Sequence, residues 1–97
     1  MKITIAIPTI AGRTKYLASA LKTCVEQSYD NMEIIVSDNS PGEALTVVQS
    51  FKDNRIKYIR PDRYLPMSAH WDFMVPHFSG DMVTIIGDDD GLTPGAL

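Results

Sequence analysis

The hydrophobic positions at the start of the chain follow first a strand period and then a helix period. Isoleucine occupies every second position over residues 3–7, which predicts a strand that Pro8 ends. Residues 14–28 carry apolar side chains at spacings of four, seven and eight positions, which predicts an amphipathic helix packed on a sheet. These side chains are Leu17, Leu21, Cys24 and Val25.

The alternation of strand and helix continues through the middle of the chain. Residues 33–37 form a continuous apolar run, typical of a strand covered on both faces. The Ser-Pro-Gly-Glu run at residues 40–43 has the form of a capping box and predicts a helix start. Residues 55–60 predict a third strand, whose charges indicate a position towards the sheet edge. The second helix is expected to turn Leu45, Val48 and Phe51 inward.

A third helix and a fourth strand complete the pattern. Pro76 should kink or shorten the helix, and residues 82–86 are the apolar run of the strand. The order β-α-β-α-β-α-β predicts an α/β fold, a Rossmann-like parallel sheet of about four strands flanked by helices with right-handed crossovers. The apolar positions of the third helix are Met67, Trp71, Met74 or Val75, and Phe78.

Composition excludes several classes of protein. The 97 residues suffice for at most one domain, and a net charge of −3 gives no electrostatic case for binding nucleic acid. No apolar run approaches the roughly 18 residues of a membrane span, and the N-terminus lacks the features of a signal peptide. A single cysteine excludes an internal disulfide. We therefore expect a cytoplasmic protein without a transmembrane segment in this chain.

Residues 93–97 look like the start of a helix, with Thr93 as N-cap and Pro94 at the first helical position. We therefore expect residues 1–97 to be part of a domain that is truncated at its C-terminus. A chain of this length buries only about 60–65% of its unfolded surface, so it is also expected to lean on further sequence or on a second copy in a homo-oligomer.

Three consecutive carboxylates, Asp88, Asp89 and Asp90, follow the fourth strand and need a compensating charge. We call residues 88–90 the acidic segment. In a parallel sheet, the loops at residues 8–10, 38–39 and 88–90 meet at one edge, where such sheets bind ligands. Water or a divalent cation would compensate the charge, and Mg²⁺ and Mn²⁺ take carboxylate and phosphate oxygens. Spacing alone favours Asp88 and Asp90, which lie on one side of an extended chain.

The first strand is not followed by a glycine-rich phosphate loop. The residues after this strand are Pro-Thr-Ile-Ala-Gly-Arg, which match neither G-x-G-x-x-G nor G-x-x-x-x-G-K-[ST]. Phosphate binding through a metal is the remaining route, which suits nucleotide-sugar or nucleotidyl transfer.

A series of short motifs runs along the whole chain, at residues 5–9, 16–17, 20–21, 27–29, 33–40, 55–58, 79–81 and 87–94. Each motif alone is weak. In their order and spacing, the motifs together resemble the nucleotide-binding half of family-2 glycosyltransferases with the GT-A fold.

The resemblance implies a nucleotide diphosphate sugar donor and a set of residues that bind it. Pro8, Thr9 and Ile10 would line the nucleobase pocket, and the pair after the second strand would hold base and ribose. That pair is Asp38 and Asn39 here, and the uncharged Asn39 leaves base selectivity open.

The family motif is Asp-x-Asp-Asp, a DXD motif, with a proline four residues after its last Asp. This motif sets the register of the acidic segment. Anchored on Pro94, it places Gly87 at the first position, and Asp89 and Asp90 at the last two. The resemblance therefore implies Asp89 and Asp90 as ligands of Mn²⁺ or Mg²⁺, with Asp88 reaching the ribose.

Other roles follow from the same resemblance. Arg13 is a candidate phosphate contact, and no catalytic base can be named, because the family's base would lie beyond Leu97. The expected reaction is hexosyl transfer to a glycan or lipid-linked acceptor in polysaccharide biosynthesis, at the cytoplasmic face of the membrane if the acceptor is lipid-linked. The 97 residues alone should bind donor without turnover.

Two alternatives remain open at this point. Residues 88–93 superficially resemble the Asp-x-Asp-Gly-Thr loop of haloacid dehalogenase-type phosphatases, but three strand–helix units precede them and Leu92 stands where Thr is expected. A non-catalytic, truncated nucleotide-binding or assembly module is the other alternative.

Overall fold

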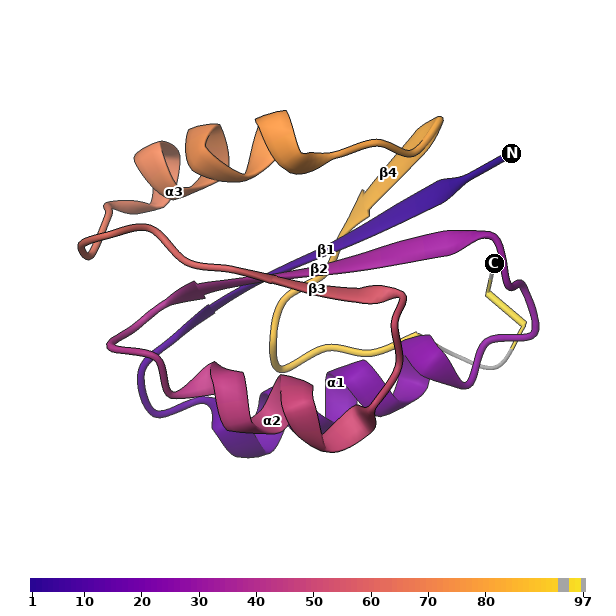
Figure 1. Cartoon of the computed structure of the whole chain (residues 1–97), viewed down its shortest axis with the longest axis horizontal. Coiled ribbons are helices and arrows are strands. Elements are labelled where there is room, and N and C mark those ends of the chain that lie inside the picture. Colours follow the sequence, from indigo (N-terminus) through magenta and orange to yellow (C-terminus); the bar gives the residue numbers. More distant parts are fainter. Residues whose placement is uncertain (93–94, 97) are drawn as a thin grey trace.

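The structure, a computed structural model, describes residues 1–92, 95 and 96. Its strands form one four-stranded parallel sheet in the order β3-β2-β1-β4 (Figure 1). The predicted α/β fold with a parallel sheet is therefore confirmed, and β3 lies at the edge, as its charges indicated. The strands are β1 (Ile3–Ile10), β2 (Met32–Asn39), β3 (Ile56–Ile59) and β4 (Met82–Ile85).

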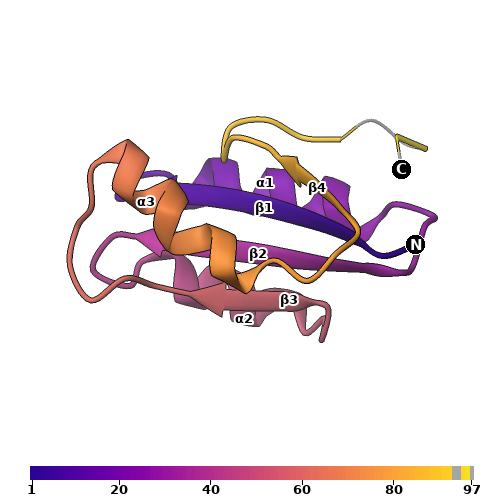
Figure 2. The same cartoon turned by 90° about the horizontal axis from the view of Figure 1, so that it is seen from above.

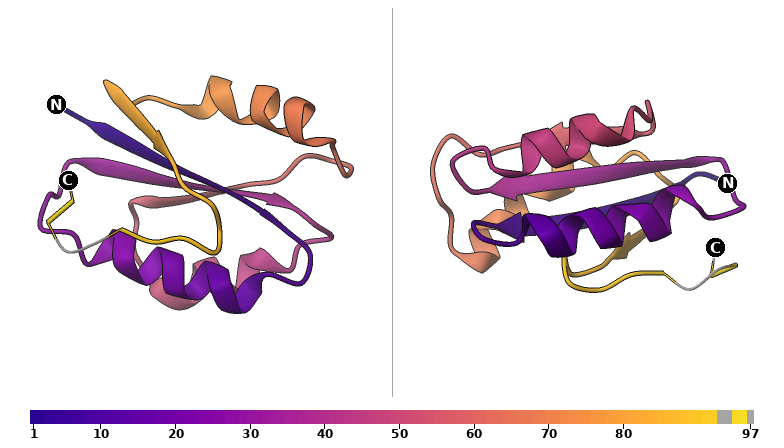
Figure 3. Two further views of the ribbon diagram at one scale, coloured as in Figure 1. Left: turned by 180° about the vertical axis from the view of Figure 1, so that it is seen from behind. Right: turned by 90° about the horizontal axis from the view of Figure 1, so that it is seen from below.

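Helices cover both faces of this sheet. Helices α1 (Thr14–Val25) and α2 (Ala44–Phe51) pack side by side on one face, and α3 (Met67–Met74) lies across the other (Figures 2 and 3). The chain steps from β1 to β2 to β3 in one direction and then returns across the sheet to β4. Because crossovers are right-handed, this reversal moves the third helix to the opposite face. The order reverses between β1 and β4, which is where open α/β sheets bind ligands.

The main core lies between the sheet and the α1 and α2 layer. The isoleucines of β1 alternate into it, and Cys24 is fully buried among them, as the helical spacing predicted. Burial raises the pKa of the Cys24 thiol to about 11, so this cysteine is a core residue. The buried cluster consists of Ile3, Ile5, Ile7, Leu17, Leu21, Cys24, Met32, Ile34, Val36 and Ala44.

Strand β1 does not end at Pro8, as the sequence predicted, but continues to Ile10. The carbonyl oxygen of Ala6 accepts from the backbone N–H of Ile86 on the β4 side, so the backbone of Pro8 also faces that side. Strand β4 has already ended at that level, at Ile85. The missing N–H of Pro8 therefore costs no ladder hydrogen bond, and β2 pairs with β1 to its last residue.

Three details of the helices differ from the sequence prediction. Helix α1 ends at Val25 rather than at residue 28. In α2, Leu45 is exposed, while Ala44, Val47, Val48 and Phe51 face the core. In α3, Met67 and Trp71 are exposed, and the buried residues are His70 and Met74.

Pro76 shortens the third helix as predicted, because the α-helical part ends at Met74 and a 3-10 turn, Val75–His77, follows. The capping box is half formed. The backbone N–H of Glu43 donates to Ser40 Oγ at 3.1 Å, but the Glu43 carboxylate accepts from the backbone N–H of Gly12 instead of returning to Ser40. This contact ties the start of α2 to the loop after β1.

At the amino ends of the strands, the carboxylate of Glu33 is 1% exposed and fully hydrogen-bonded. It accepts from Thr4 Oγ1 at 2.6 Å, from Lys57 Nζ at 2.8 Å, and from the backbone N–H and hydroxyl of Ser79 at 2.7 and 2.8 Å. Gly80 follows with its N–H on Thr4 Oγ1, at a place where a Cβ would lie 2.6 Å from the Thr4 backbone nitrogen. Glu33 thus joins β1, β2, β3 and the segment leading into β4.

Within the part of the chain that the structure describes, no helix is both long and apolar enough to cross a membrane. The expected helix start at Thr93 and Pro94 lies outside the described residues, as does Leu97.

Candidate functional site

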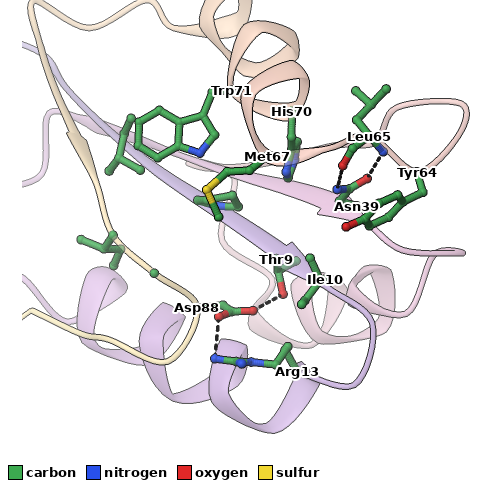
Figure 4. A pocket seen from close by; sticks show the side chains of 14 residues that line it. Thr9, Ile10, Arg13, Asn39, Tyr64, Leu65, Met67, His70, Trp71 and Asp88 are labelled. Carbon is green, nitrogen blue, oxygen red and sulfur yellow. Dashed lines mark hydrogen bonds and ion pairs between the residues drawn. The ribbon is translucent and has the colours of Figure 1, made fainter.

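A cavity of about 430 Å³ opens at the carboxyl ends of β1 and β4, beneath α3 (Figure 4). Its place is the point where the strand order reverses. Six of the residues predicted from the sequence line it, from three separate segments of the chain: Pro8, Thr9, Ile10, Arg13, Asn39 and Asp88.

Asp88 is held firmly at the cavity wall. Its side chain accepts from Thr9 Oγ1 at 2.8 Å on one oxygen, and Arg13 Nη2 lies 3.1 Å from the other. The residue is 8% exposed, so both contacts are largely shielded from water. Thr9 and Arg13 therefore fix which way Asp88 faces (Figure 4).

Arg13 supplies the positive charge that the acidic segment needs. Its Nη2 also lies 3.2 Å from Asp89 Oδ2, and its guanidinium lies 5.1 Å from the centre of the Tyr16 ring. The sequence predicts water or a divalent cation as the compensator and Arg13 only as a phosphate contact, since nothing in the spacing brings residue 13 beside residues 88 and 89. Parallel pairing of β1 with β4 brings the loop after each strand to the same edge.

Asp89 and Asp90 do not line the cavity but lie beside it, exposed to solvent. Asp89 Oδ1 and Asp90 Oδ2 converge on Gly87, where a Cβ would lie 3.0 and 2.9 Å from them. The glycine thus leaves a cradle for two carboxylate oxygens.

Hard oxygen donors are what Mg²⁺ and Mn²⁺ prefer, so the pair Asp89 and Asp90 fits such a cation. Among the described residues, no three acidic, histidine or cysteine side chains form a complete metal cage. A site of two carboxylates is typical of Mg²⁺ bound together with substrate phosphates.

Asp38, predicted to contact the nucleotide, lies behind the cavity wall and is fully buried. It accepts from Ser40 Oγ, from the backbone N–H of Ala44 and from the hydroxyl of Tyr58. Burial, together with the hydrogen bond to Asp38 and its charge, raises the pKa of Tyr58 to about 12. Asp38 therefore anchors the end of β2 and the start of α2.

Asn39 lines the cavity, but both ends of its amide are already bonded (Figure 4). Its Nδ2 donates to the carbonyl oxygen of Leu65 at 2.8 Å, and its Oδ1 accepts from the Leu65 N–H at 3.0 Å. These two hydrogen bonds fix the segment that carries Tyr64, a 71% exposed aromatic residue at the cavity rim. Behind it lies a second cavity of about 320 Å³, with Arg60 and Arg63 in its wall.

Helix α3 adds side chains to the cavity that were not predicted there from the sequence. His70 is 4% exposed and lines the cavity, with its Nε2 2.6 Å from Ser37 Oγ. Burial lowers the pKa of its imidazole, and the charge of Asp38 opposes that effect only in part. Met67 and Trp71 also face the cavity (Figure 4), although their spacing is that of core residues. Helical spacing does not tell a cavity-lining residue from a core residue. For His70 the distinguishing feature is its polar partner Ser37 on β2, which only the three-dimensional structure shows.

Comparisons with known proteins agree on one family. The family model described as "Glycosyl transferase family 2" matches residues 4–97. The chain is 36% identical over 100 residues to GalNAc(5)-diNAcBac-PP-undecaprenol beta-1,3-glucosyltransferase of Campylobacter jejuni, covering 99% of this chain and 32% of that protein. It is 32% identical over 92 residues to Glycosyltransferase GlyA of Streptococcus pneumoniae, covering 92% of this chain and 13% of that protein. The chain thus spans a third or less of these relatives.

Solved structures share the fold at lower identity. The mannosyltransferase PcManGT from Pyrobaculum calidifontis, in complex with GDP-Man and Mn²⁺, matches with a TM-score of 0.83 and 17% identity, over 96% of this chain and 29% of that one. Residues 1–349 of TarS from S. aureus, in complex with UDP-GlcNAc, match with a TM-score of 0.80 and 21% identity, over 94% and 27% of the two chains. These likenesses confirm the GT-A fold expected from the motifs.

Proposed function

This chain belongs to glycosyl transferase family 2, and from that premise we propose that its cavity binds the nucleoside diphosphate sugar whose glycosyl group passes to an acceptor hydroxyl. The observation that carries the proposal is the meeting of residues 8–10, Asn39 and Asp88 around one cavity, directly beside Asp89 and Asp90. The fold shared with glycosyltransferases in complex with GDP-Man and with UDP-GlcNAc supports it.

Each part of the cavity has a role in this proposal. Pro8, Thr9 and Ile10 form the wall for the nucleobase, and Asp88, oriented by Thr9, accepts from the ribose hydroxyls. Arg13 contacts the diphosphate. Asn39 acts by holding the Leu65 backbone, and Asp38 acts from behind the wall, because both side chains are fully engaged there.

A divalent cation, Mn²⁺ or Mg²⁺, would be held by Asp89 and Asp90. When bound, it supplies Lewis-acid stabilisation of the departing diphosphate. The residues themselves contribute two hard oxygen donors beside Gly87, close to the end of the cavity where Asp88 lies.

The described cavity residues offer no free general base. Asp88 is bonded to Thr9 and Arg13, and His70 is bonded to Ser37. We propose that these residues hold the donor and do not turn it over alone, and that other sequence of the whole protein activates the acceptor. A lipid-linked glycan is the acceptor class we propose, since the name of the Campylobacter relative contains an undecaprenol diphosphate glycan.

Calorimetric titration of the folded chain with UDP, GDP and dTDP sugars, with and without Mn²⁺, tests the proposal. We expect binding of at least one donor that depends on Mn²⁺, and its loss in Asp89→Ala, which removes one of the two metal ligands. Asp72→Asn is the matched control, because Asp72 is exposed on α3 and should bind as wild type does.

Absence of binding to every donor by folded protein would refute the proposal. A non-catalytic assembly module would show no metal-dependent nucleotide affinity for Asp89→Ala to remove. The phosphatase alternative is set aside by the family match, and release of phosphate from p-nitrophenyl phosphate would be needed to revive it.

A further inference from the structure

Arg13 forms an ion pair with Asp89, one of the two carboxylates that we assign to the cation. Its Nη2 is shared between Asp88 Oδ1 and Asp89 Oδ2, at 3.1 and 3.2 Å. The side chain of Asp88 is 11% exposed and that of Asp89 is 58% exposed. The contact with Asp88 is therefore the shielded one, and the contact with Asp89 is open to exchange with solvent ions.

The other donors of the guanidinium take no part in these two ion pairs. A guanidinium has five N–H donors, and both ion pairs use Nη2 alone. The Nε atom is buried, and no hydrogen-bond partner reaches it among the described residues. Arg13 also lines the cavity, so an anion that enters it meets a guanidinium whose ion pairs with the described residues use Nη2 alone.

We propose that Arg13 is an exchangeable counter-ion of the acidic segment. In the absence of a cation it neutralises Asp88 and Asp89. When a nucleoside diphosphate enters, Arg13 turns its free donors to the diphosphate and yields Asp89 to the divalent cation. The inference rests on the proposed function and adds that the two ligands bind cooperatively through this side chain.

The cooperativity follows from competition for one carboxylate. A cation that binds alone must displace Arg13 from Asp89 and leave the guanidinium without that partner. A diphosphate provides the replacement partner and so removes the cost. By linkage, the cation must strengthen nucleotide binding by the same factor.

The test compares Arg13→Gln with Lys15→Gln. Electron paramagnetic resonance follows the titration with Mn²⁺, both alone and in the presence of saturating UDP or GDP, and calorimetry follows the titration with UDP or GDP at saturating Mn²⁺. Lys15 is the matched control, because it is an exposed cation two residues away with no ion pair to the acidic segment among the described contacts. We expect Arg13→Gln to bind Mn²⁺ alone about three- to fivefold more tightly than wild type, from the loss of the competing ion pair. The same variant should bind the nucleotide more weakly, and Lys15→Gln should change neither affinity.

The effect of bound nucleotide on the Mn²⁺ affinity gained by Arg13→Gln separates this mechanism from general electrostatics. Removal of a nearby positive charge would raise Mn²⁺ affinity by the same ratio with and without nucleotide. Equal Mn²⁺ affinities of the two variants, or an advantage of Arg13→Gln that persists unchanged with nucleotide bound, would overturn the proposal. If wild-type protein shows no Mn²⁺-dependent nucleotide binding, the proposed function fails first and the exchange falls with it.

If Arg13→Gln does not fold, the Arg13 side chain of the wild-type protein can be followed instead. The Nε–H of Arg13 is buried, so its proton is shielded from exchange with water and can be followed by NMR. We expect its resonance to move when Mg²⁺ and UDP or GDP are added together, much more than with Mg²⁺ alone. A resonance that stays in place in the fully bound protein would contradict the exchange.

Discussion

The two ends of the sheet carry carboxylates in opposite ways. At the amino ends, Glu33 is buried and receives four hydrogen bonds from three surrounding segments. At the carboxyl ends, Asp88 and Asp89 share Arg13, and Asp90 accepts from the backbone N–H of Gly87. Asp89 and Asp90 are exposed. A buried carboxylate with every lone pair used is a structural joint, whereas a group of carboxylates with too few partners leaves room for a ligand.

The glycines beside these carboxylates show the same contrast. Gly80 lets two backbones approach, because a Cβ there would collide with the backbone of Thr4. At Gly87 a Cβ would meet only the ends of the Asp89 and Asp90 side chains. Gly80 therefore allows close packing of two strand segments, whereas Gly87 leaves a polar space beside the cavity.

Glu33→Gln should have the largest effect of the substitutions at the two ends of the sheet. The amide cannot accept all the bonds that Thr4, Lys57 and Ser79 donate, so buried donors lose their partner. We expect a loss of about 2–3 kcal/mol in the free energy of unfolding, measured by urea denaturation. Glu26→Gln, an exposed change of the same chemistry, should stay within about 0.5 kcal/mol of wild type. Equal stability of both variants would show that Glu33 is not a structural joint.

Acid should act on the amino-end carboxylate in a defined direction. Burial alone would raise the pKa of the Glu33 carboxyl, but hydrogen bonds from Lys57, Thr4 and Ser79 outweigh it and hold that pKa well below its usual range. The extra stability is therefore present above the unfolded-state pKa of about 4.3 and is lost as the pH falls below it. Urea midpoints between pH 7 and pH 3 should show wild type approaching Glu33→Gln. A constant gap across this range would contradict the assignment.

At the carboxyl ends, Asn39→Asp should have a smaller effect on stability than Glu33→Gln has at the amino ends. The new carboxylate oxygen would face the carbonyl oxygen of Leu65, so the segment bearing Tyr64 loses its anchor. We expect about 1–2 kcal/mol lower stability and weaker binding of UDP and GDP alike. Asn54→Asp, in an exposed turn, is the control. A change in the ratio of UDP to GDP affinity, with stability intact, would instead identify Asn39 as a reader of the base.

Much of the fold and part of the site could be predicted from local pattern. Each strand and helix was located, because alternation and helical spacing reflect which faces are covered. Pro8, Thr9, Ile10, Arg13, Asn39 and Asp88 could be named because they lie at or just after the carboxyl ends of strands, which share one edge. Periodicity misplaced the faces of α2 and α3, since Leu45, Met67 and Trp71 are apolar yet exposed.

The order of elements, the parallel sheet and the edge at which ligand residues gather depend on hydrophobic period and chain connectivity, so the sequence predicts them. What each polar residue does at that edge depends on the tertiary structure. Arg13 meets Asp88 and Asp89, Asn39 meets Leu65, and His70 meets Ser37, each across a separation of more than 20 residues. A hydrogen bond or ion pair depends on distances of about 3 Å between atoms. No pattern of residue types along the chain encodes such distances.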